Sequence, residues 1–159
     1  MKRTQDRAVQ YQLQMDEEGI LLAAARILEG RLQRQGQIHS PDQACNYLVA
    51  RCAHLSHEIF GVVFLDNQHH IISTEHLFSG TIDGCDVHSR VVAKRALELN
   101  AAAVILFHNH PSGNPEPSEA DRKVTQRLQE ALGLLDIRVL DHLVIGGQKS
   151  VSLASRGWA

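Results

Sequence analysis

The chain has 159 residues, of which 43% are apolar and 21% are charged, and its formal net charge is -2. These values are typical of one soluble domain with its own core, and they exclude a strongly basic surface built mainly to bind phosphate backbones. No apolar run is long enough to span a bilayer, and the polar first residues lack the apolar segment of a signal peptide. We therefore expect a cytoplasmic protein with no membrane partner, in which Cys45, Cys52 and Cys85 are free thiols.

Hydrophobic periodicity predicts helices and strands in the order α-α-β-β-α-β-α-β-β. Because the run AAAVILFH is continuously apolar, we expect that strand to be central in a sheet covered on both faces. The predicted fold class is therefore α/β or α+β, with a mixed sheet flanked by helices. The elements are expected at 16–34, 40–55, 59–66, 71–78, 88–100, 101–108, 118–135, 137–147 and 150–154.

Two histidines end the apolar strand, in the stretch HNHPSGNPEPSEAD at 108–121. Because residues two apart on a strand point to the same side, His108 and His110 can reach one ion. Asp121, in the first turn of the next predicted helix, can fold back as a third ligand. Imidazole and carboxylate ligands suit zinc, and three protein ligands leave a fourth position for water, as in catalytic zinc sites. We therefore predict a zinc site formed by His108, His110 and Asp121.

Ordinary structural roles also explain these residues. The two histidines can be loop residues, and Asp121 can cap its helix, because it follows Ser118 with the spacing of a capping box. The context favours the metal site, since a loop marked by proline and glycine between an apolar strand and a helix start is where active sites lie in α/β sheets. Asn109 alternates with the two histidines, so we expect it to point away from the metal and to have a structural role.

A hydrolytic zinc site also needs a general base. Glu58 stands at the start of the strand EIFGVVFLD, and Glu75 lies on the neighbouring predicted strand. Either carboxylate can also be a solvated charge at a strand end, and the residues alone do not choose between them. Asp141 and His142 are adjacent on an apolar strand and face opposite sides, so that one of them can orient the site or satisfy a buried partner.

The stretch 108–121 resembles the JAMM (MPN+) motif, which reads His-x-His-Pro, a short insert and then Ser-x-x-Asp. The sequence around it is similar to the JAB domain of the RadC family over about residues 40–159. The resemblance implies a cytidine-deaminase-like mixed sheet flanked by helices. The residues before it, 1–39, are expected to form a helical extension, because 16–34 has the apolar periodicity of a helix. The resemblance also implies one catalytic zinc held by His108, His110 and Asp121.

The resemblance assigns two further site residues. The stretch EIFG matches the Glu-x-x-Gly pattern at the start of a JAMM strand, which favours Glu58 over Glu75 as the general base. Ser118 matches the serine that stabilises the oxyanion in active JAMM peptidases, a role compatible with capping its helix. The sequence departs from the family pattern in two places. The residues before 40 are too few for the helix-hairpin-helix region of full-length RadC proteins, so the chain resembles shorter RadC-like proteins. In addition, HSRV at 88–91 replaces the usual HPRE.

Three functions are compatible with these patterns. The resemblance favours a zinc metalloprotease, a hydrolase that cleaves a peptide or isopeptide bond in an unknown polypeptide substrate. The second hypothesis is a DNA-repair-associated accessory or nucleic-acid-processing protein, against which the acidic charge balance counts. The third is a non-catalytic binding module with a structural zinc. The sequence leaves open the substrate and whether the protein is a monomer or a homodimer.

Overall fold

The computed structural model describes residues 36–52, 54–80 and 87–159. Residues 37–159 form one compact unit. The predicted helix at 16–34, the residue Cys85 and most of the loop at 79–87 lie outside the described residues. None of the helices that the structure describes is long and apolar enough to cross a lipid bilayer.

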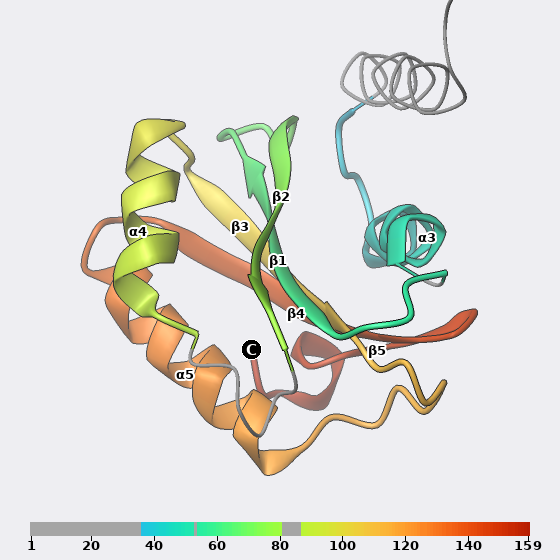
Figure 1. Ribbon diagram of the computed structural model, residues 1–159. Coiled ribbons are helices and arrows are strands. Elements are labelled where there is room, and N and C mark those ends of the chain that lie inside the picture. Colours follow the sequence, from blue (N-terminus) through green and yellow to red (C-terminus); the bar gives the residue numbers. More distant parts are fainter. Residues whose placement is uncertain (1–35, 53, 81–86) are drawn as a thin grey trace, which may run out of the picture. The chain divides into compact units, whose positions relative to one another are not determined.

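The elements of this unit are, in chain order, α3 (Pro41–Cys52), β1 (Ile59–Leu65), β2 (Ile71–Ser79), α4 (Ser89–Glu98), β3 (Ala103–Asn109), α5 (Glu119–Gly133), β4 (Arg138–Gly146), β5 (Lys149–Ser152) and the short 3-10 helix η1 (Ala154–Arg156). The strands form one sheet in the order β2-β1-β3-β4-β5 (Figure 1). β1 is antiparallel to β2 and β3, β3 is parallel to β4, and β5 is antiparallel to β4. The expected fold class, a mixed sheet flanked by helices, is confirmed.

Helices cover both faces of the sheet (Figure 1). α4 and α5 pack on one face and α3 packs on the other, because successive strand residues point to opposite sides. β3 is buried at all 7 of its positions, which confirms the prediction of a central strand. One core cluster joins Phe60, Val62 and Leu106 of the sheet to Val92 of α4 and Leu128 of α5. The other joins Val63, Ile105 and Phe107 of the sheet to Ala44 and Leu48 of α3.

The end of α4 and the start of β3 differ from the prediction for a local reason. α4 ends at Glu98, because Asn100 takes a left-handed φ of 52° and the Ala101 N–H donates to the Ala96 carbonyl at 2.9 Å. β3 therefore begins two residues later than predicted, at Ala103, and continues one residue past His108 to Asn109. His108 and Asn109 thus both lie within the sheet, where adjacent side chains point to opposite faces.

Candidate metal centre

Three parts of the chain meet where β3 ends. β1 runs antiparallel to β3 with Phe60 opposite His108, so Glu58, which precedes β1, lies beside the end of β3. His110 follows β3 directly, and its backbone N–H donates to the Ile145 carbonyl on β4 at 2.7 Å. The loop at 111–117 then leads to α5, whose first turn contains Asp121. Side chains far apart in the sequence are thereby brought to one edge of the sheet.

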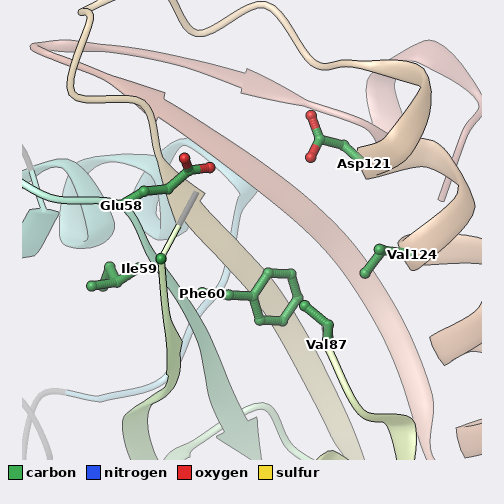
Figure 2. A pocket seen from close by; sticks show the side chains of 7 residues that line it. Glu58, Ile59, Phe60, Val87, Asp121 and Val124 are labelled. Atoms are coloured by element: carbon green, nitrogen blue, oxygen red, sulfur yellow. The ribbon is translucent and has the colours of Figure 1, made fainter. Parts of the chain in front are cut away.

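Two imidazoles and two carboxylates converge at this edge. His108 Nε2 lies 3.0 Å from His110 Nε2. One ligand atom from each of Glu58, His108 and His110 lies within 4.8 Å of the others. Asp121 Oδ1 is 3.4 Å from His108 Nε2, and Figure 2 shows Glu58 and Asp121 on opposite sides of one pocket. His108 and Asp121 are buried, whereas Glu58 and His110 are partly exposed, so the centre has a closed side and an open side.

Asp121 has a separate role for each carboxylate oxygen. Oδ2 accepts hydrogen bonds from the Ser118 N–H at 2.6 Å and from the Ser118 hydroxyl at 2.9 Å. Ser118 Oγ in turn accepts from the Asp121 N–H at 3.2 Å, which completes a capping box at the start of α5. Oδ1 is the oxygen that faces His108. The capping box uses Oδ2, so it leaves Oδ1 available for the ligand role that the sequence predicted as its alternative.

Asn109 holds the backbone on both sides of Glu58. Its Oδ1 accepts from the Ile59 N–H at 2.9 Å, and its Nδ2 donates to the His57 carbonyl at 2.9 Å. The Glu58 carbonyl accepts from the Gly80 N–H at 3.1 Å. The middle residue of the HNH tripeptide therefore ties the end of β3 to the start of β1 and fixes the point from which the Glu58 side chain extends.

Glu75 is engaged away from the two histidines. Its carboxylate accepts two hydrogen bonds from Arg95 on α4, at 2.7 and 2.8 Å, and one from the Ser73 hydroxyl at 2.9 Å. The hydrogen bonds from Arg95 hold the pKa of the Glu75 carboxyl below its ordinary value, against the opposing effect of partial burial. Of the two carboxylates that the residues alone left open, Glu58 is the one grouped with His108 and His110.

The buried histidines of this region are neutral at pH 7. Burial lowers the pKa of the His108 imidazole from 6.5 to about 4, although the charge of Asp121 opposes the shift. Burial also holds the pKa of His142 well below 6.5. A neutral imidazole offers an electron pair to a metal, and two imidazole nitrogens beside carboxylate oxygens are a donor set that suits zinc. The residues present therefore fit a zinc ion.

The loop at 111–117 packs tightly against the end of β4. His110 Nδ1 donates to the Asn114 carbonyl at 2.7 Å, so the loop orients the His110 ring. A Cβ atom on Gly146, the last residue of β4, would lie 2.5 Å from the backbone nitrogen of Pro115. Only glycine allows this approach without displacing the loop.

The C-terminal segment provides a second attachment for this loop. Glu116 accepts two hydrogen bonds from the Arg156 guanidinium, at 2.5 and 2.9 Å. The guanidinium carbons of Arg156 and Arg122 lie 5.7 and 5.2 Å from the centroid of the Trp158 ring. The residues that follow β5 thus help to hold the loop that orients His110.

Residues 38–158 match the RadC-like JAB domain. The chain belongs to this family. A UPF0758 protein of Vibrio cholerae is 54% identical over 142 residues, which are 89% of each chain. UPF0758 proteins of Stutzerimonas stutzeri and Xanthomonas oryzae pv. oryzae are 52% and 56% identical, over 89% and 85% of this chain but only 63% and 60% of their own lengths. The chain thus spans about three fifths of these two longer relatives, and the family expected from the sequence is confirmed.

Within this RadC-like JAB domain, Asp141 and His142 have distinct contacts. Asp141 accepts hydrogen bonds from the Ser152 hydroxyl at 2.6 Å and from the Ala154 N–H at 3.0 Å, so it joins β4 to the C-terminal segment. His142 is fully buried, and its Nε2 lies 2.8 Å from His108 Nδ1. His142 is therefore the member of the pair that contacts the candidate metal centre.

Thr125 on α5 is a residue of the centre that sequence reasoning missed. Its hydroxyl lies 2.6 Å from His142 Nδ1 and donates to the Asp121 carbonyl at 2.7 Å. Thr125 is fully buried and stands four residues after Asp121, one turn further along the helix. A polar residue on the same helix face as the predicted ligand was the signal in the sequence that could have identified it.

A small pocket adjoins the candidate ligands (Figure 2). Its volume of about 20 Å³ is enough for one water molecule. Apart from the two carboxylates, the side chains that line it are apolar, and an environment of this kind strengthens the electrostatic interactions beside it. The lining residues are Glu58, Ile59, Phe60, Gly80, Val87, Asp121 and Val124.

Proposed function

We propose that this RadC-like JAB domain is a zinc-dependent hydrolase of the JAMM type, which cleaves a peptide or isopeptide bond in a polypeptide substrate. The observation that best supports the proposal is the grouping of Glu58 with His108 and His110 on the partly exposed side of the centre. A structural zinc site is normally closed by four protein ligands of the Cys and His type. A partly exposed carboxylate beside a pocket the size of one water favours hydrolysis instead.

Each residue has a proposed task. Zinc held by His108, His110 and Asp121 would supply a Lewis acid that polarises the scissile carbonyl and makes water more acidic. Glu58 accepts a proton from the attacking water and delivers it to the leaving nitrogen. Its backbone is held by Asn109, so the carboxylate extends from a rigid strand end.

Ser118 is the proposed donor to the oxyanion that develops on the substrate. In the structure its hydroxyl proton is directed at Asp121 Oδ2. Ser118 is exposed at the start of α5, so rotation of its hydroxyl toward a bound substrate requires no change in the backbone. The capping bond from the Asp121 N–H to Ser118 Oγ can persist in that rotamer, because it uses an electron pair of the oxygen.

The two other hypotheses lead to different results in simple experiments. A nucleic-acid-processing protein should shift DNA in a gel, with an affinity that falls steeply as salt rises. A binding module with a structural zinc should unfold when a chelator removes the metal. The proposed hydrolase should keep its fold after chelation, because helices cover both faces of its sheet and bury its core without the metal. It should not shift DNA, because its formal net charge is -2.

The direct test is Glu58→Gln, which keeps the shape of the side chain and removes the base. Zinc-loaded wild type is first assayed on a panel of peptide and isopeptide-linked substrates. We expect kcat of the variant to fall by about 10²–10⁴, with zinc content unchanged by elemental analysis.

Glu75→Gln is the matched control. It makes the same change in the rival carboxylate, which lies on β2 of the same hairpin and forms an ion pair with Arg95 of α4. It should retain wild-type turnover. Equal turnover by wild type and Glu58→Gln would remove Glu58 from the mechanism. Salt-dependent DNA binding without cleavage of any amide would replace the proposed function with the nucleic-acid alternative.

A further inference from the structure

We propose that Thr125 and His142 are positioning residues that fix the tautomer of His108, so that His108 Nε2 presents an electron pair to the metal. The inference rests on the proposed metal centre, but its evidence is a chain of buried hydrogen bonds. The chain runs from the first turn of α5 through Thr125 and His142 to His108. All three side chains are fully buried, so no solvent molecule competes for these groups.

The first step fixes the proton of Thr125. Its Oγ1 lies 2.7 Å from the Asp121 carbonyl oxygen, which can only accept a hydrogen bond. The single hydroxyl proton of Thr125 is therefore directed at that carbonyl. Thr125 Oγ1 is left with electron pairs and acts as an acceptor toward its other neighbour.

The second step fixes the proton of His142. His142 Nδ1 lies 2.6 Å from Thr125 Oγ1. Because the threonine proton is already used, the hydrogen bond between them requires a proton on His142 Nδ1. His142 is thus the Nδ1-protonated tautomer.

The third step places the proton on His108. His142 Nε2 and His108 Nδ1 are 2.8 Å apart, and one proton lies between them. If it belonged to His142, this ring would be a cation with no solvent exposure, which costs several kcal/mol without a paired charge. The hydrogen bond therefore runs from His108 Nδ1–H to His142 Nε2, and His108 Nε2 is the ring nitrogen left to face the metal position.

The consequence is that the Nε2 atoms of His108 and His110 face each other. His110 Nδ1 donates to the Asn114 carbonyl, so His110 also turns its Nε2 toward the centre. The two Nε2 atoms lie 3.0 Å apart. Both can therefore serve as ligands of one cation. Asp121 contributes twice, with its carboxylate beside the metal position and with its carbonyl as the end of the chain that sets the His108 tautomer.

Two variants of Thr125 test this series of hydrogen bonds. Thr125→Val keeps the shape of the side chain and removes the hydroxyl, so His142 Nδ1 loses its acceptor and the His108 tautomer is no longer fixed. Thr125→Ser keeps the hydroxyl. We expect Thr125→Val to bind zinc about 10–100-fold more weakly in competition with a chromogenic chelator, and Thr125→Ser to remain close to wild type. Cobalt-loaded protein should show an altered visible spectrum in Thr125→Val only.

A second measurement reads the tautomers directly. Long-range proton–nitrogen NMR correlations distinguish protonated from unprotonated ring nitrogens in the metal-free wild type. We expect both His108 and His142 to carry the proton on Nδ1. A proton on Nε2 of either ring overturns the inference, as does equal zinc affinity of Thr125→Val and Thr125→Ser. Because the wild type is measured, the test does not depend on the folding of a variant.

The outcomes separate this inference from the proposed function. If the wild type shows the expected tautomers but cleaves no amide, the proposed function fails and the inference stands. If zinc-loaded wild type cleaves an amide and Glu58→Gln does not, but His108 is protonated on Nε2 in the metal-free protein, only the inference fails.

Discussion

The two histidines of the candidate metal centre are positioned by different parts of the molecule. His108 is fixed by two fully buried side chains, His142 and Thr125. We call these three residues the core half of the centre. His110 is fixed by a backbone carbonyl in the loop at 111–117. We call His110 and this loop the loop half of the centre. Changes in the core half should therefore alter folding stability and metal binding together. Changes in the loop half should alter metal binding with little effect on the fold.

Acid should affect the core half most strongly. The pKa of His108 is about 4 in the folded protein and 6.5 ordinarily, so between these values the unfolded chain binds a proton that the folded chain does not. The contribution of His108 to the stability of the metal-free protein is therefore fully present above about pH 6.5. It is lost as the pH falls toward 4, and the loss from this residue is up to about 3 kcal/mol. His142 adds a loss of the same sign. Urea denaturation of the chelator-treated protein over this range measures the effect.

Carboxylates also titrate at the acid end of this range, so the contribution of His108 needs a comparison. His108→Asn removes the titrating ring, and its stability should depend less steeply on pH than that of wild type. Parallel curves for the two proteins would show that His108 does not contribute, and the core half would then lose its distinguishing property.

Gly146→Ala should displace the loop at 111–117 and so weaken metal binding through the loop half. The new Cβ would lie 2.5 Å from the Pro115 nitrogen and 2.7 Å from the Gly113 carbonyl oxygen, and both are backbone atoms that cannot rotate away. The loop must shift, which weakens the hydrogen bond from His110 to the Asn114 carbonyl. We expect zinc affinity to fall about 10–100-fold, measured by chelator competition, with the far-UV spectrum unchanged.

Gly147→Ala is the matched control for this substitution. Gly147 has a φ of 59° and no atom within 4 Å of an added Cβ. Alanine there costs about 1–2 kcal/mol of stability through backbone strain, but it does not contact the loop. Zinc affinity should therefore fall for Gly146→Ala and not for Gly147→Ala. An equal fall in both would attribute the effect to general destabilisation.

The sequence predicted those features of the molecule that depend on local pattern. The apolar run before His108 identified the central strand, and its alternation placed His108 and His110 on one side. The residues alone did not choose Glu58 over Glu75, because the choice depends on how β1 pairs with β3, a contact between segments far apart in the chain. Thr125 was missed for a related reason, since its role depends on the rotation of α5 against the sheet. Family resemblance supplied the preference for Glu58 but gave no information on Thr125.

The attachment of the loop to the C-terminal segment should give the smallest effect. Arg156 and Glu116 form a two-bonded ion pair, but their side chains are 34% and 58% exposed, so solvent screens the pair and it should contribute little to stability. Arg156→Gln should therefore weaken zinc binding only a few-fold, and the difference from wild type should shrink at high salt. Arg122→Gln is the matched control, because Arg122 also stacks on Trp158 but is not paired with Glu116. If both variants weaken zinc binding equally, the stack on Trp158 rather than the ion pair holds the loop half in place.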